Sequence, residues 1–496
     1  MLSLIIFLPV ITGLLIAAGG KGYSRFTGGA ALAVSIGMSL LCAFCIVDFA
    51  RGGQDIAFME YVPWIESFAI NYFTGITALN AVFLLLTAVV MPVVIGVAVR
   101  NYPENAMMIG LLLVEQGLLT GVFAMQNLLL WFFFWELTLV PVFFLIKEYG
   151  AEQRAFAAYK FFLYTLLGSL PMLLSFLYIY YQFGTLDLST TGSQGFKSLY
   201  ALDSIGNSAA PEAFRGLAFW VFLGIFLGVA VKIPLYPLHS WQPDAYTQAP
   251  TPVSMFLTGI MSKMGVYGML VLYTLMPVTF GIHAEWILWI AAITMAVSIT
   301  VALLKNDLKE IIAYSSLNHV AICALGISAM ALMTGQQALM KGQLQTGVLV
   351  QVFSHGLSGA LLFLLAGILE KRSGTRLLGG PWGLRHQMPV FAGFFGVAVF
   401  ATIGLPGLSG FIGEFLIFKG AFEMSPYATA LAFLGLIPMT MVMLKVISRV
   451  LYGPLDAQFA HTHDMNRAER VAAIPFVILI ILIGLWPKTI IWIWNW

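Results

Sequence analysis

Apolar stretches of roughly 20 residues recur along the whole chain, and they restrict what it can fold into more than any other feature. A helix of about 20 apolar residues crosses the hydrocarbon core of a bilayer. Only 9% of the 496 residues are charged, against about a quarter in soluble domains. We therefore predict an all-α polytopic membrane protein with about 14 transmembrane helices. The predicted spans are residues 2–19, 28–50, 76–99, 106–124, 127–147, 159–181, 215–236, 252–276, 286–304, 311–333, 346–369, 390–422, 427–451 and 471–492.

One of these stretches is interrupted by a lysine and two prolines. Residues 216–231 read as a membrane-spanning helix, and Lys232 follows, with Pro234 and Pro237 close behind. A cation near the bilayer core costs at least about 2.5–3.5 kcal/mol on insertion scales, so such residues face protein or water and mark ion paths. Proline removes a backbone donor and clashes with the preceding turn. We predict a broken helix near 232–237, as in transporters.

A second interruption is predicted in the other half of the chain. The twelfth span is overlong and contains GLPGLSGFIGEF (404–415), with Pro406 and several glycines. Two discontinuous helices in separated halves indicate an inverted-repeat transporter whose path lies near the bilayer midplane. We predict two inverted five-helix repeats, the second broken near 404–413. The predicted divisions are helices 1–3 (1–105), the first repeat (106–276), the second repeat (277–452), and a C-terminal loop with helix 14 (453–496).

Basic residues are distributed unevenly among the predicted loops, which indicates the orientation in the membrane. Loops after odd-numbered helices hold most of them, so these loops are predicted to be cytoplasmic and both termini to face a periplasm or its equivalent. The longest loops, 51–75 and 182–214, then fall on the outer side, where we expect them to cover the helices. The odd loops contain Lys21, Arg25, Arg100, Lys147, Arg154, Lys305, Lys309, Lys371, Arg372, Arg376, Arg385, Arg467 and Arg470, and the even loops contain Arg51, Lys197, Arg215 and Lys341.

Several classes of function lack support in the sequence. There is no Walker motif, no GxGxxG after a strand and no cysteine cluster. The chain itself is therefore not expected to hold ATP, a dinucleotide, an iron–sulfur centre or a metal. The CxxC of Cys42 and Cys45 lies in an apolar helix without basic neighbours and is interpreted as packing, as is Cys323. The net charge of +2 gives no indication of nucleic-acid binding.

Titratable residues inside the predicted spans are the candidates for function, because a buried charge is costly. Glu136 sits among aromatic residues in LWFFFWELTLVPVF and must be protonated or paired with a cation. Lys232 has the same standing, and a nearby carboxylate can control when it releases a proton. Lys263 lies mid-helix in VSMFLTGIMSKMGVYGML, a long reach for snorkelling to water, so a relay is favoured.

Two histidines and two further carboxylates extend this set. His319 and His355 lie in consecutive spans near serines able to hold water, and such a pair favours a proton relay over isolated core histidines. Glu414 follows the second predicted break and mirrors Lys232 in placement. Glu115, in LLLVEQGLLTG, is interpreted as either an ion-pair partner or a proton carrier.

Polar groups just past the first break are secondary candidates. His239, Asp244 and Tyr246 lie where the chain approaches water. Two roles are open for them, stabilising the unwound segment and conducting protons.

The candidate residues lie in longer motifs, namely FFFWELTLVPVF (132–143), KFFLYTLLGS (160–169), VKIPLYPLHSWQPDAYTQAPTPVS (231–254), MSKMGVYG (261–268), NDLKEIIAYSSLNH (306–319) and GLPGLSGFIGEF (404–415). Together they resemble the antiporter-like subunits of respiratory complex I over nearly the whole chain. The resemblance is greatest to the subunit M branch, the mitochondrial ND4 type, because Glu414 stands where the L and N subunits usually carry lysine. Gln242, Tyr246 and Glu310 depart from the commonest pattern, and the change at Tyr246 removes support for a proton role there.

The resemblance implies roles for the residues of the first half. Glu136 corresponds to the fifth-helix glutamate that pairs with the seventh-helix lysine, here Lys232. Lys263 corresponds to the central lysine of the eighth helix. Opening of the Glu136–Lys232 pair would drive a proton from Lys232 toward Lys263.

The second half supplies the remainder of the implied path. His319 and His355 correspond to bridging histidines, and Glu414 to the terminal acid near the exit. The expected path therefore runs from Lys263 across His319 and then His355 to Glu414, with waters between the broken helices completing it.

The resemblance implies a proton-translocating membrane subunit of NADH–quinone oxidoreductase in a bacterial inner membrane. NADH, flavin, iron–sulfur clusters and quinone are expected in other subunits, and no cofactor in this one. The expected partners are the other membrane subunits of the complex, including two antiporter-like neighbours, with the lipid bilayer and protons, and no nucleic acid. The alternatives are an Mrp-type cation/proton antiporter subunit, a membrane subunit of an energy-converting hydrogenase, and a structural membrane scaffold whose buried charges hold helices together.

Overall fold

A computed structural model describes residues 1–19, 24–68, 70–188, 202, 212–379, 382–455, 457–459 and 462–494. Among these residues, eleven helices are long and apolar enough to cross a membrane, and three shorter apolar helices accompany them. The chain is thus a helical polytopic membrane protein, as predicted. Much of the predicted loop 182–214, with Lys197, lies outside the described residues, as does Lys21.

The first half of the chain contains the helices that lead to the first break. They are α1 (Leu2–Ala18), α2 (Ser24–Gly52), α3 (Ala81–Asn101), α4 (Ala106–Ala124), α5 (Leu128–Leu137), α6 (Leu139–Tyr149), α7 (Arg154–Phe183), α8 (Glu212–Lys232), α9 (Trp241–Gln248), α10 (Thr251–Phe256) and α11 (Ser262–Leu275), with a π-helical turn (Leu257–Met261) joining the last two. The predicted span 127–147 is interrupted at Thr138 into α5 and α6, which together form one membrane-length segment, Leu128–Tyr149. Glu136 lies in the last turn of α5. Pro141, which has no backbone N–H to donate, lies in the first turn of α6, where no donor is needed.

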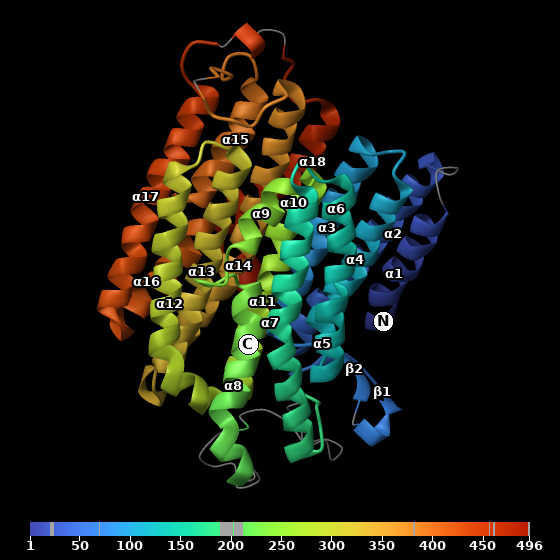
Figure 1. The fold of residues 1–496 in the computed structure, drawn as a ribbon, viewed down its shortest axis with the longest axis vertical. Helices are drawn as coiled ribbons and strands as arrows, with labels where there is room; N and C mark the ends of the chain where they lie inside the picture. The colour runs from blue at the N-terminus through green and yellow to red at the C-terminus, as the bar shows by residue number, and fades with distance from the viewer. Residues whose placement is uncertain are drawn as a thin grey trace.

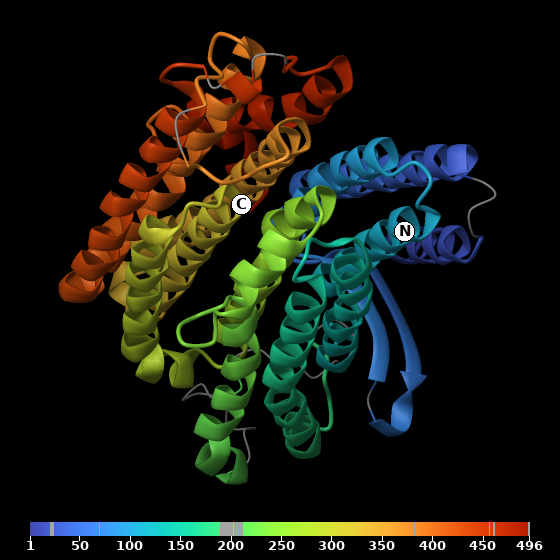
Figure 2. The same ribbon diagram turned by 45° about the horizontal axis from the view of Figure 1, so that its top comes forward.

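The second half of the chain is also a series of helices that contains one break. Its helices are α12 (Pro277–Leu304), α13 (Leu308–Leu332), α14 (Ala338–Ser373), α15 (Pro389–Thr402), α16 (Ser409–Met424), α17 (Pro426–Leu451), α18 (Arg467–Leu485) and the short α19 (Lys488–Ile491). The apolar core of α14 is wholly buried, and this helix contacts α3, α10, α13, α16 and α18. Figures 1 and 2 show the N-terminal helices α1 and α2 on one side of the molecule and the C-terminal helices α16 and α17 on the other, with the middle of the chain between them. Helix α14 therefore joins the two halves.

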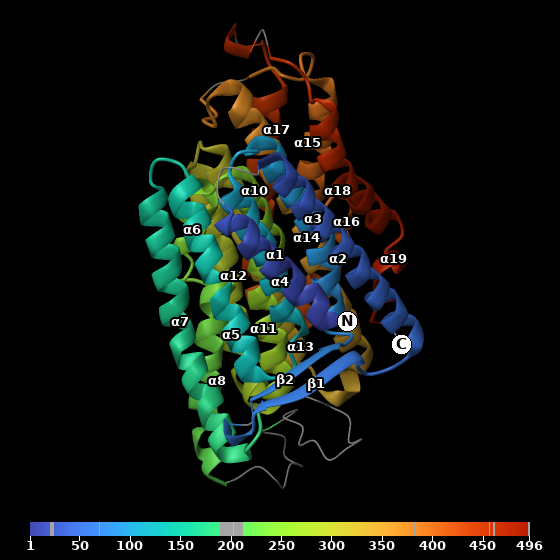
Figure 3. The ribbon, with the colours of Figure 1, turned by 90° about the vertical axis from the view of Figure 1, so that its right-hand side faces the viewer.

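A β-hairpin departs from the all-α prediction. Strands β1 (Ala57–Ile65) and β2 (Ile70–Ile76) pair antiparallel within the stretch that was expected to be a loop over the helices. Strand β2 contacts α1, α4 and α5, and Figure 3 shows the hairpin at one end of the bundle. Glu60 of β1 binds the amino group of Met1 and the hydroxyl of Ser3. These contacts between residues far apart in sequence hold the hairpin against α1.

Two helix interruptions lie where the sequence analysis expects them. The first separates α8 from α9 at residues 233–240, and the second separates α15 from α16 at residues 403–408. Gly404 has a φ of 70°, in the left-handed region that a helix cannot continue through. Pro234 lacks the backbone N–H that a continuing helix would donate. The second break is shorter than predicted, because the backbone is already helical from Ser409.

Candidate functional site

Lys232 ends the first broken helix and is buried beside aromatic rings. It is the last residue of α8 and is 1% exposed. Its Nζ lies 5.4 Å from the centroid of the Trp135 ring and 6.0 Å from that of the Phe161 ring. The electron-rich face of an aromatic ring attracts a cation placed over it. The Lys232 ammonium is therefore stabilised by rings at the point where its helix stops.

Glu136 and Glu115 act electrostatically on Lys232, but neither closes an ion pair with it. Glu115 lies midway along α4 and is 0% exposed. Ser169 of α7 is a polar side chain next to Glu136, and its hydroxyl donates to the carbonyl of Leu166 at 2.9 Å. The expected Glu136–Lys232 pair is thus open in this structure, and Glu115 is a second carboxylate that acts on the same lysine.

Helix α11, which carries Lys263, packs directly onto the first break. A Cβ on Gly265 would lie 2.9 Å from the carbonyl carbon of Lys232, so this close approach requires glycine. Lys263 is on the same helix and is 1% exposed. No hydrogen bond joins the two lysines within the described part of the chain. Proton transfer between them therefore needs an intermediate carrier such as water.

Lys263 is held by the π-helical turn that precedes it. Such turns leave carbonyls out of the regular helical ladder and are frequent at functional sites. The Nζ of Lys263 donates to the carbonyl oxygen of Thr258 in this turn and to Oγ of Ser262 at 3.1 Å. It also lies 3.1 Å from Nδ1 of His355 on α14. The amino group of Lys263 thus contacts Thr258 and Ser262 in its own helical segment and the imidazole of His355 on α14.

His319 and Glu414 form a second contact, next to His355. Nδ1 of His319, on α13, lies 3.2 Å from Oε1 of Glu414, on α16, which is ion-pair distance when the histidine is protonated. Gln351 of α14 places Nε2 3.3 Å from the same Nδ1. The rings of His319 and His355 have centroids 5.2 Å apart. The order in space is therefore Lys263, His355, His319, Glu414, and we call these four residues the buried relay.

The order of these contacts differs from the order of the predicted path, which has His319 before His355. Gly356 of α14 lets its helix pack against the π-turn, since a Cβ there would lie 2.8 Å from the carbonyl oxygen of Gly259. This packing brings His355, the adjacent residue, next to Lys263. The spacing of residues along a chain does not encode which of two neighbouring helices approaches a third, so the sequence alone could not give the order.

Comparisons with known proteins identify the family. Residues 125–440 match the family described as NADH:quinone oxidoreductase/Mrp antiporter, TM. NADH-quinone oxidoreductase subunit M of Rickettsia bellii is 34% identical over 453 residues, which cover 90% of this chain and 86% of the relative. NADH-ubiquinone oxidoreductase chain 4 of Arabidopsis thaliana is 35% identical over 448 residues, covering 89% of this chain and 85% of the relative. This chain belongs to the subunit M family of NADH-quinone oxidoreductase.

The membership in the subunit M family extends to the three-dimensional fold. A chain in the structure of respiratory complex I from Thermus thermophilus with bound NADH is 30% identical and superposes with a TM-score of 0.84. The match covers 99% of this chain and 96% of that chain. The two chains therefore share their fold almost from end to end.

The secondary candidates His239 and Asp244 form no hydrogen bond or ion pair with the buried relay of this subunit M family member. Asp244 of α9 forms an ion pair with Lys160 of α7 at 2.7 Å. This contact ties the segment after the first break to a neighbouring helix. The ring of His239 lies 5.6 Å from that of Tyr236 within the break itself. Of the two roles left open by the sequence, the contacts of Asp244 favour stabilisation of the unwound segment.

Tyr246 is a support of the π-turn rather than a member of the relay. Its hydroxyl donates to the carbonyl of Leu257, the first residue of that turn, at 2.8 Å. The side chain is 1% exposed. The same carbonyl also accepts the backbone N–H of Ser262, so Tyr246 supplies a second donor to it.

Gln351 is a site residue that the sequence analysis does not single out. It is 1% exposed and contacts His319 through Nε2. A signal was present, because Gln351 precedes His355 by one helical turn, and residues four apart share one face of a helix. An amide side chain on the same helix face as a candidate histidine therefore indicates that Gln351 belongs with the candidate site residues.

The described residues contain no group of three or more His, Cys, Asp or Glu side chains that could hold a metal ion. Cys42, Cys45 and Cys323 are buried free thiols. The groups that the structure does bring together are amine, imidazole and carboxyl groups, and their shared chemistry is proton exchange.

Proposed function

We propose that this chain translocates protons as the antiporter-like subunit M of a NADH-quinone oxidoreductase, where it couples electron transfer in other subunits to proton pumping. The single observation that carries the proposal is the buried relay, in which Lys263 contacts His355 and His319 contacts Glu414. The two histidine rings adjoin, so no member is isolated. Each of the four groups can bind and release a proton, and burial of such groups in membrane helices is characteristic of proton paths.

The surroundings of Lys232 supply the coupling step of this proposal. A carboxylate that approaches Lys232 stabilises its charged form, and withdrawal of that carboxylate makes loss of the proton easier. Glu136 and Glu115 both act on the lysine from a distance in the open arrangement. A shift of either carboxylate would therefore change the proton occupancy of Lys232 and, through water, of Lys263. No cofactor in this chain takes part.

We further propose about 14 transmembrane helices with two inverted five-helix repeats. The repeats are residues 106–276 and 277–452, flanked by helices 1–3 (1–105) and by a C-terminal loop with helix 14 (453–496). Support comes from the two breaks, which have the same backbone hydrogen bonds at corresponding positions. In the first break these bonds run from Ile233 N to Val229 O at 2.8 Å, from Leu235 N to Ala230 O at 2.9 Å and from Leu238 N to Leu235 O at 2.6 Å. In the second break they run from Ile403 N to Val399 O, from Leu405 N to Phe400 O and from Leu408 N to Leu405 O, each at 3.0 Å.

A second pair of matching structures supports the inversion. Helices α7 and α14 both end at a glycine with φ of 67°, Gly184 and Gly374. In each case the first residue of an earlier helix donates its backbone N–H to the segment after the glycine, from Leu128 N to Leu186 O and from Leu308 N to Arg376 O. The first of these sites adjoins the hairpin, since Gln126 donates to Phe73. The second site lies in the segment that leads from α14 to α15, and Figure 1 shows the hairpin and α15 toward opposite ends of the molecule.

The proposed location is the bacterial inner membrane, with both termini on the periplasmic side. This orientation rests on the basic residues of the loops that are predicted to be cytoplasmic. The proposed partners are the other membrane subunits of the complex, including two antiporter-like neighbours, and the bilayer.

Proton pumping per electron in the assembled complex tests the proposal. Lys263→Met removes the ammonium that contacts His355 and keeps an unbranched apolar side chain of similar length, so the ratio of protons pumped to electrons transferred should fall. Lys445→Met, on α17 and outside the buried relay, is the matched control. A Lys263→Met complex that pumps as many protons per electron as the unmodified complex would contradict the proposal and favour a structural role for the buried charges.

A further inference from the structure

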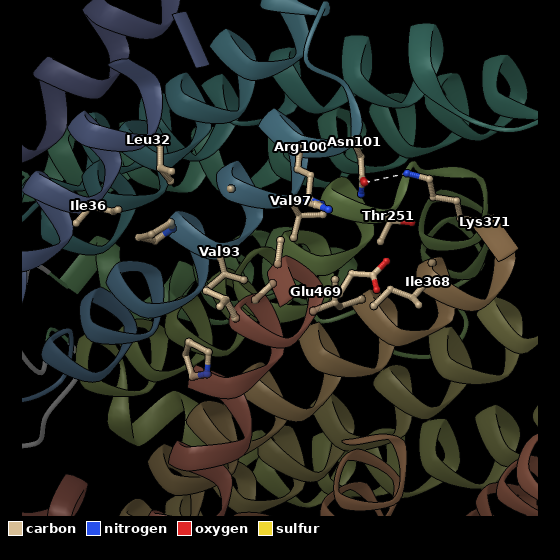
Figure 4. Close-up of a pocket in the computed structure, with 18 residues that line it drawn as sticks. Leu32, Ile36, Val93, Val97, Arg100, Asn101, Thr251, Ile368, Lys371 and Glu469 are labelled. Atoms are coloured by element: carbon tan, nitrogen blue, oxygen red, sulfur yellow. Dashed lines mark hydrogen bonds between the residues drawn. The ribbon is translucent and has the colours of Figure 1, made fainter. Parts of the chain in front are cut away.

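A groove between α2, α3, α14 and α18 has apolar walls and a basic mouth (Figure 4). Its volume is about 440 Å³, within the range of roughly 300–1,000 Å³ of ligand sites. We propose that this groove binds an anionic phospholipid, with one acyl chain along the apolar walls and the phosphate at Arg100 and Lys371.

The walls suit an acyl chain because they are apolar over about two helical turns. Pro92 and Val97 of α3, Leu364 of α14, and Val471 and Pro475 of α18 line them. Along α3 the lining extends from Pro92 to Arg100, about 12 Å at the helical rise of 1.5 Å per residue. The deep end is apolar on all of these helices, and the charged groups are confined to the helix ends.

The mouth suits an anion because its cations lack carboxylate partners. Arg100 lies in the last turn of α3 and Lys371 in the last turn of α14. Lys371 Nζ donates to the neutral Oδ1 of Asn101 at 3.2 Å, and in the described ranges neither cation lies at ion-pair distance from a carboxylate. Glu469 also lines the groove, but it forms an ion pair with Arg372 at 2.5 Å. Two positive charges therefore remain uncompensated, and Figure 4 shows Arg100, Asn101 and Lys371 together at one end.

The position of the groove favours a lipid over a free anion. It opens on outward faces that carry exposed apolar side chains, such as Leu40 of α2 at 67% and Val471 of α18 at 61% exposure. A second cavity of about 490 Å³ adjoins the mouth, with Arg467 among its lining residues. Basic pockets between transmembrane helices on the cytoplasmic side bind anionic headgroups. Arg100, Lys371 and Arg467 all belong to the loops that are predicted to be cytoplasmic.

Photo-crosslinking in the assembled complex tests the site. The complex is reconstituted into phosphatidylcholine vesicles that contain a small share of phosphatidylglycerol with a diazirine in its acyl chain, and labelled peptides are mapped by mass spectrometry. The same diazirine in phosphatidylcholine and an excess of inorganic phosphate provide the comparison arms. We expect labelling of α3 and α18 by phosphatidylglycerol that exceeds labelling by phosphatidylcholine and that phosphate does not displace.

Three variants separate the headgroup contact from the chain contact. Arg100→Gln and Lys371→Gln should each reduce labelling roughly fivefold, the effect of one basic residue near an anionic lipid surface. Gly96→Leu should also reduce it, because a Cβ at Gly96 meets only Leu32 Cδ1 at 3.8 Å and a leucine there would extend into the groove. Gly37→Leu, with open space around it, and Arg154→Gln, outside the groove, are the matched controls.

Each remaining outcome overturns the proposal. Equal labelling by the two lipids would show an apolar groove without headgroup recognition. Displacement by inorganic phosphate, with no effect of Gly96→Leu, would show a phosphate site. Crosslinks from these helices to a neighbouring subunit in place of lipid would show a protein interface. Proton pumping is measured alongside, so that failure of the lipid site is distinguished from failure of the complex.

Discussion

The carboxylate of Glu414 lies against the backbone of Gly404 in the second break, and a Cβ at Gly404 would overlap with its Oε2. Gly404 has a φ of 70°, a conformation that favours glycine. One glycine therefore allows the chain to leave α15 and leaves room for the acid that faces His319. The unwound segment and the last member of the buried relay depend on the same residue.

Gly404→Ala is expected to displace Glu414 from His319 and to lower proton pumping per electron. Gly407→Ala is the matched control, because Gly407 has a φ of 93° but open space around it. Both variants incur backbone strain of order 1–3 kcal/mol, and only the first overlaps with the carboxylate. Pumping is measured in reconstituted complexes. Equal losses in the two variants would mean that backbone strain, and not the position of Glu414, is responsible.

His355 and His319 are expected to act in series, because each provides one contact of the buried relay. Alanine at either position should slow proton transfer by roughly 100-fold or more, the effect of removing a positioned proton-transfer group. The double variant should be no slower than the slower single variant. His283→Ala, whose ring packs on Phe219 outside the relay, is the control. Losses that multiply in the double variant would indicate two independent routes.

Trp135 is expected to hold the Lys232 ammonium in the open arrangement. Trp135→Leu removes a cation–π contact worth about 0.5–2 kcal/mol, so pumping should fall, whereas Trp135→Phe should retain most of it. Trp131→Leu is the control, because Trp131 is a buried neighbour in edge contact with Trp135. The readout is the pumping ratio of the three complexes. A loss in Trp131→Leu as large as in Trp135→Leu would assign the effect to packing.

Asp187 is expected to tie the hairpin to the start of α5 and to make that contact depend on pH. Its carboxylate accepts hydrogen bonds from Nδ2 of Asn71 and Nδ2 of Asn127, each at 2.7 Å. Burial raises the pKa of Asp187 above its usual value of 3.8, although the two amide donors oppose this. The folded state therefore keeps the Asp187 carboxyl proton to higher pH than the unfolded state does. The contribution of Asp187 to the free energy of unfolding is greatest below pH 3.8 and is lost as pH rises through the raised pKa.

Limited proteolysis of the hairpin measured against pH checks this expectation. Asp187→Asn should flatten the pH dependence and increase cleavage, because one amide donor loses its acceptor at a cost of about 1–3 kcal/mol. Asp55→Asn, at an exposed position before β1, should change neither. An unchanged pH profile in Asp187→Asn would assign the dependence to another group.

Each predicted span overlaps one or two helices, although some bounds differ. Helix α12 begins at Pro277 and α14 at Ala338, before the predicted starts at 286 and 346. The predicted span 106–124 coincides with α4, because a long apolar stretch without proline has no other stable form in hydrocarbon. Hydropathy does not predict the hairpin, because its strands lie outside the apolar stretches. The two strands pair with each other, and β2 contacts α1, α4 and α5. Strand pairing of this kind depends on partners that hydropathy does not reveal.

The sequence by itself identified the ionisable residues that lie inside the apolar spans. The cost of a charge in hydrocarbon does not depend on its partners, so Glu115, Glu136, Lys232, Lys263, His319, His355 and Glu414 could be selected from their positions in apolar runs. Only the tertiary structure decided that His355 precedes His319, that the Glu136–Lys232 pair is open and that Gln351 joins the relay. These relationships depend on the rotation and approach of packed helices, which arise from contacts between residues far apart in the chain.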